Sequence, residues 1–345
     1  MERDLWQYLK TAQKPIVLYG MGNGADKIIK VLQENKIAFS GIFASDGFQR
    51  EKLFHGMRVE SYADLKSRFG DMIVLLCFGS ARKEVIENVK RISLEQELYA
   101  PEVPVIGGGL FNLEYYQEHK KEFDEIYSLL ADDKSKQTFL NVIKYKISGK
   151  LEYLFECEVD ENEPYNSFLP TKTGESFLDL GAYNGDTVLD FVARNPDYEK
   201  IIAAEPDKKT FKKLTLNTEH LKNIRCENVC ISDFTGKGFF SMKAGRNSIV
   251  SDSGEEAQFY TVDDLVKDEK ITFIKMDVEG QEKNAIIGAE NTIKSQKPRM
   301  LISSYHRTED LLSIPRAVLS VNPDYKVYLR HFVSLPAWDT AYYFI

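Results

Sequence analysis

The sequence predicts an α/β protein with two tandem domains of the same type, and two observations support this. Residues 15–35 (PIVLYGMGNGADKIIKVLQEN) and 175–195 (ESFLDLGAYNGDTVLDFVARN) each begin with an apolar strand-length run, enter a glycine-rich turn and continue with a helical period. The 345 residues also exceed the usual length of one domain. Because strand, glycine turn and helix are the opening units of a parallel sheet, we expect two tandem Rossmann-like domains.

The first half continues the alternation of strands and helices. Further strands are predicted at 37–46 and 71–79, with helices at 62–70 and 81–92. From about residue 111 the chain becomes polar, aromatic and helical, and residues 160–174 are rich in turn formers without a period. We therefore predict an N-terminal domain at 1–110, a helical linker region at 111–172 and a C-terminal domain at 173–345.

The second half contains seven predicted strands with helices between them. Its last two strands follow one another, which closes the sheet with a strand pair, and a hairpin is expected around residues 236–242. The strands are predicted at 177–181, 200–206, 225–232, 272–277, 299–305, 325–332 and 340–345.

Composition limits the classes of partner and compartment. The formal net charge of −8 argues against a nucleic-acid substrate, which needs a basic surface. The charged N-terminus lacks the apolar segment of a secretory signal, and the longest apolar runs, such as 72–78, are too short for a membrane span. Four cysteines without paired spacing are typical of buried residues in a reducing compartment. We expect a cytoplasmic protein without a membrane span.

A candidate ligand site follows the first strand of the second half. The turn has the pattern Asp-x-Gly-x-x-x-Gly, and Glu205 ends the next predicted strand some twenty residues later. Glycines let a ligand approach the backbone, and an acid at that spacing can accept hydrogen bonds from ribose hydroxyls. The alternative is a glycine turn without a ligand. The candidate residues are Asp179, Gly181, Ala182, Tyr183, Asn184, Gly185, Asp186 and Glu205.

A second candidate site follows the strand predicted at 272–277. Asp277 and Glu279 stand two residues apart before a glycine and a helix. Ends of parallel strands are where α/β folds place their sites, so these carboxylates are candidates to hold a divalent metal or to orient a substrate hydroxyl. The alternative is that Asp277 caps the following helix.

These motifs together resemble the FkbM family of methyltransferases over residues 170 to 345. DLGAYNGD, IIAAEP, CISDFTGKGFF, KMDVEGQEKNAIIGAE and the terminal WDTAYYF occur in the family's order. The resemblance implies a class I methyltransferase sheet of seven strands, S-adenosylmethionine as cofactor and O-methylation, commonly of sugars or polyketide-type natural products. It also implies that Asp179, Gly181 and Gly185 line the cofactor, that Glu205 contacts its ribose, and that Ser232 and Asp233 lie near its adenine.

A catalytic base must take the proton of the acceptor hydroxyl. His306 follows the strand predicted at 299–305 and should lie at the same sheet edge as Asp277. A neutral imidazole can accept a proton near neutral pH, and Asp277 is the rival base. A metal held by Asp277 and Glu279 would make a strong base less necessary. The expected partner is a small-molecule hydroxyl acceptor, above all a carbohydrate, and a homo-oligomer is left open.

The N-terminal turn leaves other classes of function open. Gly20, Gly22 and Ala25 follow a G-x-G-x-x-A nucleotide-binding pattern, with Asp46 at the end of the next predicted strand. The turn predicts either a nucleotide ligand or a module used only for packing. One rival hypothesis is a nucleotide-dependent oxidoreductase or epimerase that uses this turn. A second rival is a non-catalytic module that binds S-adenosylmethionine without consuming it.

Overall fold

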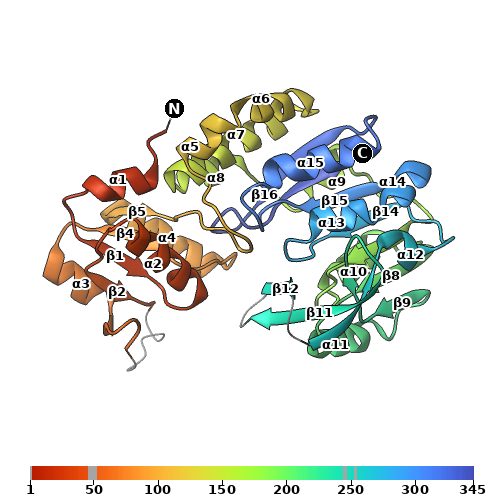
Figure 1. Cartoon of the computed structure of the whole chain (residues 1–345), viewed down its shortest axis with the longest axis horizontal. Helices are drawn as coiled ribbons and strands as arrows, with labels where there is room; N and C mark the ends of the chain where they lie inside the picture. The colour runs from red at the N-terminus through yellow and green to blue at the C-terminus, as the bar shows by residue number, and fades with distance from the viewer. Residues whose placement is uncertain (1, 46–52, 244–246, 252–254) are drawn as a thin grey trace.

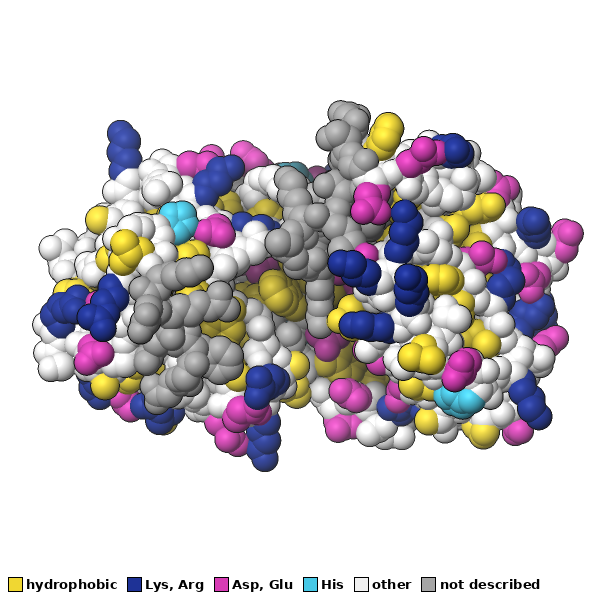
Figure 2. Space-filling model, turned by 90° about the horizontal axis from the view of Figure 1, so that it is seen from below, with side chains coloured by type: hydrophobic (Ala, Val, Ile, Leu, Met, Phe, Trp, Pro, Cys, Tyr) yellow, Lys and Arg dark blue, Asp and Glu magenta, His cyan; other side chains and the backbone are white. Residues whose placement is uncertain are grey.

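The computed structural model describes residues 2–45, 53–243, 247–251 and 255–345, so the predicted acid Asp46 lies outside the described residues. The chain forms two lobes joined by a narrower waist, and helices α5–α8 lie along the top of the junction (Figure 1). The view from below shows acidic and basic side chains on both lobes (Figure 2).

The N-terminal lobe is built on a five-stranded parallel sheet of order β3-β2-β1-β4-β5. The central strands β1 and β4 are fully buried because the helices cover both faces of the sheet, which is why they are apolar at every position. The strands are β1 (Ile16–Tyr19), β2 (Gly41–Phe43), β3 (Val59–Glu60), β4 (Ile73–Leu76) and β5 (Glu97–Tyr99). The helices of this lobe are α1 (Leu5–Thr11), α2 (Asn23–Glu34), α3 (Tyr62–Phe69) and α4 (Lys83–Glu95).

The region between residues 111 and 172 is helical, as predicted, and it packs on the C-terminal sheet. Arg330 on β16 is buried and forms ion pairs with Asp132 and Glu163 of this region, while the Leu329 amide donates to Ser135 Oγ at 3.0 Å. Its elements are α5 (Leu113–Glu118), α6 (Lys120–Leu129), α7 (Asp133–Ser148), α8 (Glu152–Cys157), β6 (Glu158–Val159) and α9 (Glu163–Ser167).

The C-terminal lobe contains an eight-stranded sheet of order β6-β16-β17-β15-β14-β7-β8-β9. Strand β17 runs antiparallel to both of its neighbours, and the strands from β15 to β9 run parallel. Six of the seven predicted strands are present in this sheet as predicted, but the strand predicted at 225–232 is divided: its first part is β9, whereas its last part, Cys230–Ile231, pairs in a second sheet. The two-residue strand β6 adds an eighth strand beside β16. The strands are β7 (Ser176–Leu180), β8 (Lys200–Ala204), β9 (Ile224–Glu227), β14 (Phe273–Met276), β15 (Arg299–Ser303), β16 (Val327–Phe332) and β17 (Thr340–Phe344).

A smaller four-stranded sheet of order β10-β13-β11-β12 lies beside the large one and contains the predicted hairpin. Its strands are β10 (Cys230–Ile231), β11 (Gly236–Lys243), β12 (Asn247–Ser251) and β13 (Glu255–Tyr260). The helices of the lobe are α10 (Asp186–Arg194), α11 (Lys208–Thr218), α12 (Val262–Val266), α13 (Glu282–Ile287), α14 (Glu290–Gln296) and α15 (Asp310–Val321). Among the described helices, none combines the length and apolar character needed to cross a membrane.

The two lobes are joined by backbone contacts. Ser80, after β4, exchanges two backbone hydrogen bonds with Leu335, which lies in the loop between β16 and β17. The Ile106 amide donates to the carbonyl of His306 at 2.9 Å. One buried apolar cluster runs from the N-terminal sheet through the helical region into the C-terminal sheet. The C-terminal ends of β15 and β16 are therefore supported by the N-terminal lobe.

Candidate active site

A cavity of about 600 Å³ opens at the carboxyl ends of the central parallel strands of the C-terminal sheet. Its walls come from the segments after β7, β8, β14 and β15, because the ends of neighbouring parallel strands meet at one edge. Six of the predicted site residues line it: Gly181, Tyr183, Asp186, Glu205, Asp277 and Glu279.

The glycine turn after β7 brings two strand ends into close contact. Gly181 has φ +80°, and a Cβ atom there would lie 1.8 Å from the carbonyl oxygen of Asp277. No other residue type fits this position without displacing the segment after β14. Gly185 has φ +90° and is the N-cap of α10. The sequence predicted that this turn requires glycine, and at Gly181 the close approach of the Asp277 carbonyl is the reason.

Glu205 is held at the cavity wall by backbone amides. Its two carboxylate oxygens accept hydrogen bonds from the amides of Tyr183 at 3.0 Å and Asp207 at 2.9 Å. The residue is only 8% exposed. Burial raises the pKa of Glu205 to about 7, and the two amide bonds only partly oppose the shift. Each oxygen retains a lone pair that can accept a ligand hydroxyl.

Asp179 lies beneath the turn and does not line the cavity. It is fully buried, forms an ion pair with Lys275 Nζ at 3.2 Å and accepts a hydrogen bond from Thr187 Oγ1. Lys275 also donates to the carbonyl of Gly181 at 3.1 Å. Burial disfavours the Lys275 cation, but Asp179 and Asp277 nevertheless hold the pKa of Lys275 above its usual value. This pair therefore fixes the position of the glycine turn from below.

Asp277 follows β14 and faces the cavity. The Tyr305 hydroxyl donates to its carboxylate, at 3.2 Å from Oδ1 and 3.4 Å from Oδ2. The N-cap of α13 is Gln281, so the alternative that Asp277 caps this helix is wrong. The carboxylate is consequently available to a ligand in the cavity.

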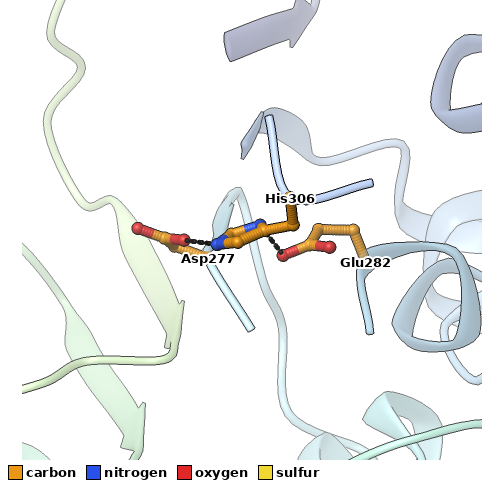
Figure 3. Close-up of side chains that lie close together, drawn as sticks. All are labelled: Asp277, Glu282 and His306. Atoms are coloured by element: carbon orange, nitrogen blue, oxygen red, sulfur yellow. Dashed lines mark ion pairs between the residues drawn. The ribbon is translucent and has the colours of Figure 1, made fainter. Parts of the chain in front are cut away.

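His306 lies behind the cavity wall rather than in it. The side chain is 1% exposed and is surrounded by three carboxylates. Its Nδ1 lies 3.0 Å from Glu282 Oε1, and its Nε2 lies 3.5 Å from both Asp277 Oδ1 and Glu279 Oε2. Burial opposes the charged imidazole, but the carboxylates raise the pKa of His306 well above 6.5. Figure 3 shows the ring between Asp277 and Glu282.

The structure separates the other predicted site residues into two groups. Ala182, Asn184 and Gly185 belong to the turn but do not line the cavity. Ser232 and Asp233 follow β10, whose residues Cys230 and Ile231 line the cavity although Ser232 and Asp233 do not. Among the aromatic residues of the region 111–172, Tyr165 lines the cavity, whereas Tyr153 and Phe155 pack against the apolar core.

Several residues of the site were missed by sequence reasoning. Lys275 interrupts the apolar strand β14 two residues before Asp277, and a lysine in a central strand is a signal that could have identified it. Tyr305 adjoins His306, and Glu282 lies one turn after the two predicted carboxylates. Asp339, in the loop before β17, also lines the cavity, and its place in the terminal motif WDTAYYF is the signal that could have identified it.

Comparisons with known proteins agree with this architecture. Residues 179–323 match the family model described as the methyltransferase FkbM domain. A crystal structure of the methyltransferase FkbM from Methylobacillus flagellatus KT aligns with a TM-score of 0.71 and 22% identity, covering 96% of this chain and 90% of that one. This likeness shows the fold across both lobes.

Fibrillarin from Aeropyrum pernix, in complex with S-adenosyl-L-methionine, aligns with a TM-score of 0.32 and 14% identity over 50% of this chain and 67% of its own. Precorrin-6y C5,15-methyltransferase from Geobacter metallireducens GS-15 gives the same TM-score and identity over 50% and 79%. Both likenesses are too distant to carry an argument. A search of curated proteins found no match to the chain.

Proposed function

Since residues 179–323 place the chain in the FkbM methyltransferase family, we propose that it transfers the methyl group of S-adenosylmethionine to a hydroxyl of a small molecule, with a sugar or glycan precursor as the expected acceptor. The cavity supports this proposal because one wall carries the glycine turn and Glu205 and another carries Asp277 and Glu279. Cofactor and acceptor groups thus face one space.

The cofactor is proposed to bind along the glycine turn. Glu205 would accept the ribose hydroxyls at its remaining lone pairs, and Gly181 and Asp277 would line the methionine end. Asp179 acts indirectly, since its bond to Lys275 supports the turn from beneath. Ser232 and Asp233 are proposed to shape the adenine end through their attachment to β10 rather than by lining the cavity.

Asp277 is the better candidate for the proton acceptor of the two that the sequence offered. It lines the cavity, whereas His306 is buried behind it and surrounded by carboxylates that favour its protonated form. In the proposed step the acceptor oxygen forms a bond to the methyl carbon, the carbon–sulfur bond breaks, and the hydroxyl proton passes to Asp277. S-adenosylhomocysteine and the methyl ether are the products.

One observation carries the proposal: the Tyr183 amide binds the Glu205 carboxylate at the edge of a cavity that also contains Asp277. The test is calorimetric titration of the full chain with S-adenosylmethionine and, separately, with NAD. We expect micromolar binding of S-adenosylmethionine, and we expect Glu205→Ala to weaken it at least tenfold. Binding of NAD alone would refute the proposal and favour the oxidoreductase hypothesis.

Turnover is tested with a panel of sugars and nucleotide-sugars, with S-adenosylhomocysteine formation as the readout. Asp277→Asn should lower the rate by about 10²–10⁴-fold, the usual contribution of a positioned base, while cofactor affinity stays within threefold. Cofactor binding without product on any acceptor would favour the non-catalytic binding module.

We also propose that the chain divides as predicted, into an N-terminal domain at 1–110, a linker region at 111–172 and a methyltransferase domain at 173–345.

The N-terminal turn is proposed to recognise a nucleotide handle on the acceptor. Gly20 and Gly22 have φ +111° and +114°, and a Cβ at Gly24 would lie 2.2 Å from the Cys77 carbonyl oxygen, as a tight strand–turn–helix unit requires.

A further inference from the structure

His306 has a feature that a purely structural histidine rarely shows. It is 1% exposed, yet neither ring nitrogen has a hydrogen-bond partner with suitable geometry among the described residues. Asp277, Glu282 and His306 each offer a donor atom, and these atoms lie within 4.8 Å of one another (Figure 3). An unsatisfied buried imidazole aimed at carboxylates calls for an explanation.

We propose that His306 Nε2, Asp277 Oδ1 and Glu279 Oε2 bind a divalent transition-metal ion at the cavity wall, with Glu282 as the outer partner of the imidazole. The Nε2 atom lies 3.5 Å from each of these carboxylate oxygens. Ligands at about 2.0–2.2 Å from a metal lie roughly 3.0–3.5 Å from one another, so both nitrogen–oxygen separations suit an ion that His306 shares with these carboxylates.

Glu282 has the position of an outer partner rather than of a ligand. Its Oε1 already accepts the amides of Val278 at 3.0 Å and Gly280 at 3.3 Å, and it faces His306 Nδ1 at 3.0 Å. A carboxylate beside Nδ1 favours the tautomer that carries its proton on Nδ1 and leaves Nε2 free to coordinate, as is usual for metal-bound histidines. The site therefore contains the three proposed ligands and also Glu282, which orients the imidazole ligand.

The open side of the site faces the cavity. Asp277 and Glu279 line the cavity, whereas His306 and Glu282 do not, so free coordination positions point to where an acceptor hydroxyl would lie. The mixture of imidazole and carboxylate ligands favours Mn²⁺, Co²⁺ or Zn²⁺ over Mg²⁺ and Ca²⁺, which prefer oxygen ligands alone. A role for the ion in activating the hydroxyl rests on the proposed function, but the binding itself does not.

The experiment uses the full chain, stripped with EDTA and titrated with Mn²⁺ and Co²⁺ by calorimetry, with the visible spectrum of Co²⁺ as a second readout. We expect one ion per chain and at least tenfold weaker binding of Mg²⁺. His306→Gln should abolish the Co²⁺ spectrum, Glu282→Gln should weaken binding about 10–100-fold, and the exposed His220→Gln should change nothing.

Far-UV circular dichroism of each variant identifies any that fail to fold. If His306→Gln does not fold, metal affinity is compared between the wild type and Glu282→Gln, which keeps all three ligands. Absence of Mn²⁺ and Co²⁺ binding to the folded wild type, or binding that His306→Gln leaves unchanged, would overturn the metal site. Methyl transfer by the metal-free protein would refute a metal role while leaving the proposed function intact. Metal binding without any affinity for S-adenosylmethionine would refute the proposed function while leaving the metal site intact.

Discussion

The Glu205 carboxylate accepts the backbone amide of Tyr183 at 3.0 Å, and this bond joins the acid after β8 to the turn after β7. Tyr183 itself has φ +47°, a conformation that non-glycine residues seldom adopt. The turn is thus held from the side by Glu205 and from below by Lys275, which donates to the Gly181 carbonyl at 3.1 Å. A cofactor would meet a preformed wall, so little ordering would accompany its binding.

Glu205 should make the stability of the ligand-free protein fall as the pH rises from about 4.5 to about 7. Its folded-state pKa of about 7 exceeds the ordinary glutamate value of 4.5, so between these values the folded chain holds a proton that the unfolded chain has lost. The stabilisation is complete below pH 4.5 and is lost as the pH rises through 7. The shift corresponds to roughly 3 kcal/mol.

Urea unfolding at several pH values, in wild type and Glu205→Gln, measures this effect. The variant loses one acceptor for a backbone amide, which lowers its stability at every pH by about 1–3 kcal/mol. Its stability should nevertheless show less of the fall between pH 5 and 7.5. Equal slopes in both proteins would contradict the assignment of the pKa shift to Glu205.

Gly181→Ala should be much more damaging than another substitution at a positive-φ glycine. The new Cβ would lie 1.8 Å from the Asp277 carbonyl oxygen, so the segment after β14 would have to move. Gly174→Ala is the matched control, because Gly174 has φ +71° but no atom of the described residues within 4 Å of a Cβ atom. We expect roughly 1 kcal/mol of destabilisation at Gly174, and at least 2 kcal/mol more at Gly181.

Thermal and urea unfolding of both variants give the comparison directly. Calorimetry with S-adenosylmethionine then separates stability from binding, since a displaced Asp277 segment should also weaken the cofactor site. Similar losses of unfolding free energy in the two variants would mean that backbone strain alone causes the destabilisation, and that contact with the Asp277 carbonyl adds nothing.

The sequence predicted the parts of the site that depend on local pattern. Gly181, Glu205 and Asp277 each follow an apolar strand, and the parallel topology brings such strand ends together. The fold class and the strand pair at the C-terminus could be predicted for the same reason. Strand β6 could not, because two residues carry no period and their pairing with β16 depends on how the helical region packs.

Tertiary pairing decided the remaining parts of the site. Lys275 and Asp179 are direct neighbours in the register of β14 and β7, a relationship that neither strand reveals alone. His306 was placed correctly beside Asp277, but its burial depends on Glu282 and on the Ile106 amide that donates to its carbonyl. Ile106 lies 200 residues away in the chain, so no local pattern could have identified that contact.

Lys275→Met should strongly destabilise the protein, because it leaves the fully buried Asp179 carboxylate without its cation. Removing one partner of a buried ion pair typically costs about 3–5 kcal/mol. Asp179→Asn in the Lys275→Met background should recover part of the loss, since a neutral amide needs no counter-ion. Urea unfolding of the wild type, both single variants and the double variant yields the coupling energy.

A coupling energy near zero would show that the two residues do not act as a pair. Lys200→Met is the control, because Lys200 forms an ion pair with Glu269 while about a third exposed. Its loss should cost less than about 1 kcal/mol, as for other exposed ion pairs.

The contact of Gly79 with Trp338 should couple the N-terminal lobe to the cavity. A Cβ atom on Gly79 would lie 2.2 Å from the Trp338 ring, and Gly79 lacks the positive φ that would itself disfavour alanine. Gly79→Ala should therefore push on the loop between β16 and β17, whose residue Asp339 lines the cavity. We expect a loss of about 1–3 kcal/mol in stability, as for other overpacked contacts.

Trp338→Ala supplies the matched background, since it removes the ring that the new methyl group would strike. Gly79→Ala should then cost less than about 0.5 kcal/mol, which gives a coupling energy of about 1–2 kcal/mol in urea unfolding. Affinity for S-adenosylmethionine should be lower in Gly79→Ala than in the wild type. In the double variant it should be the same as in Trp338→Ala alone. Additive losses would mean that the alanine acts through the N-terminal lobe alone, and that the loop does not transmit its displacement to Asp339.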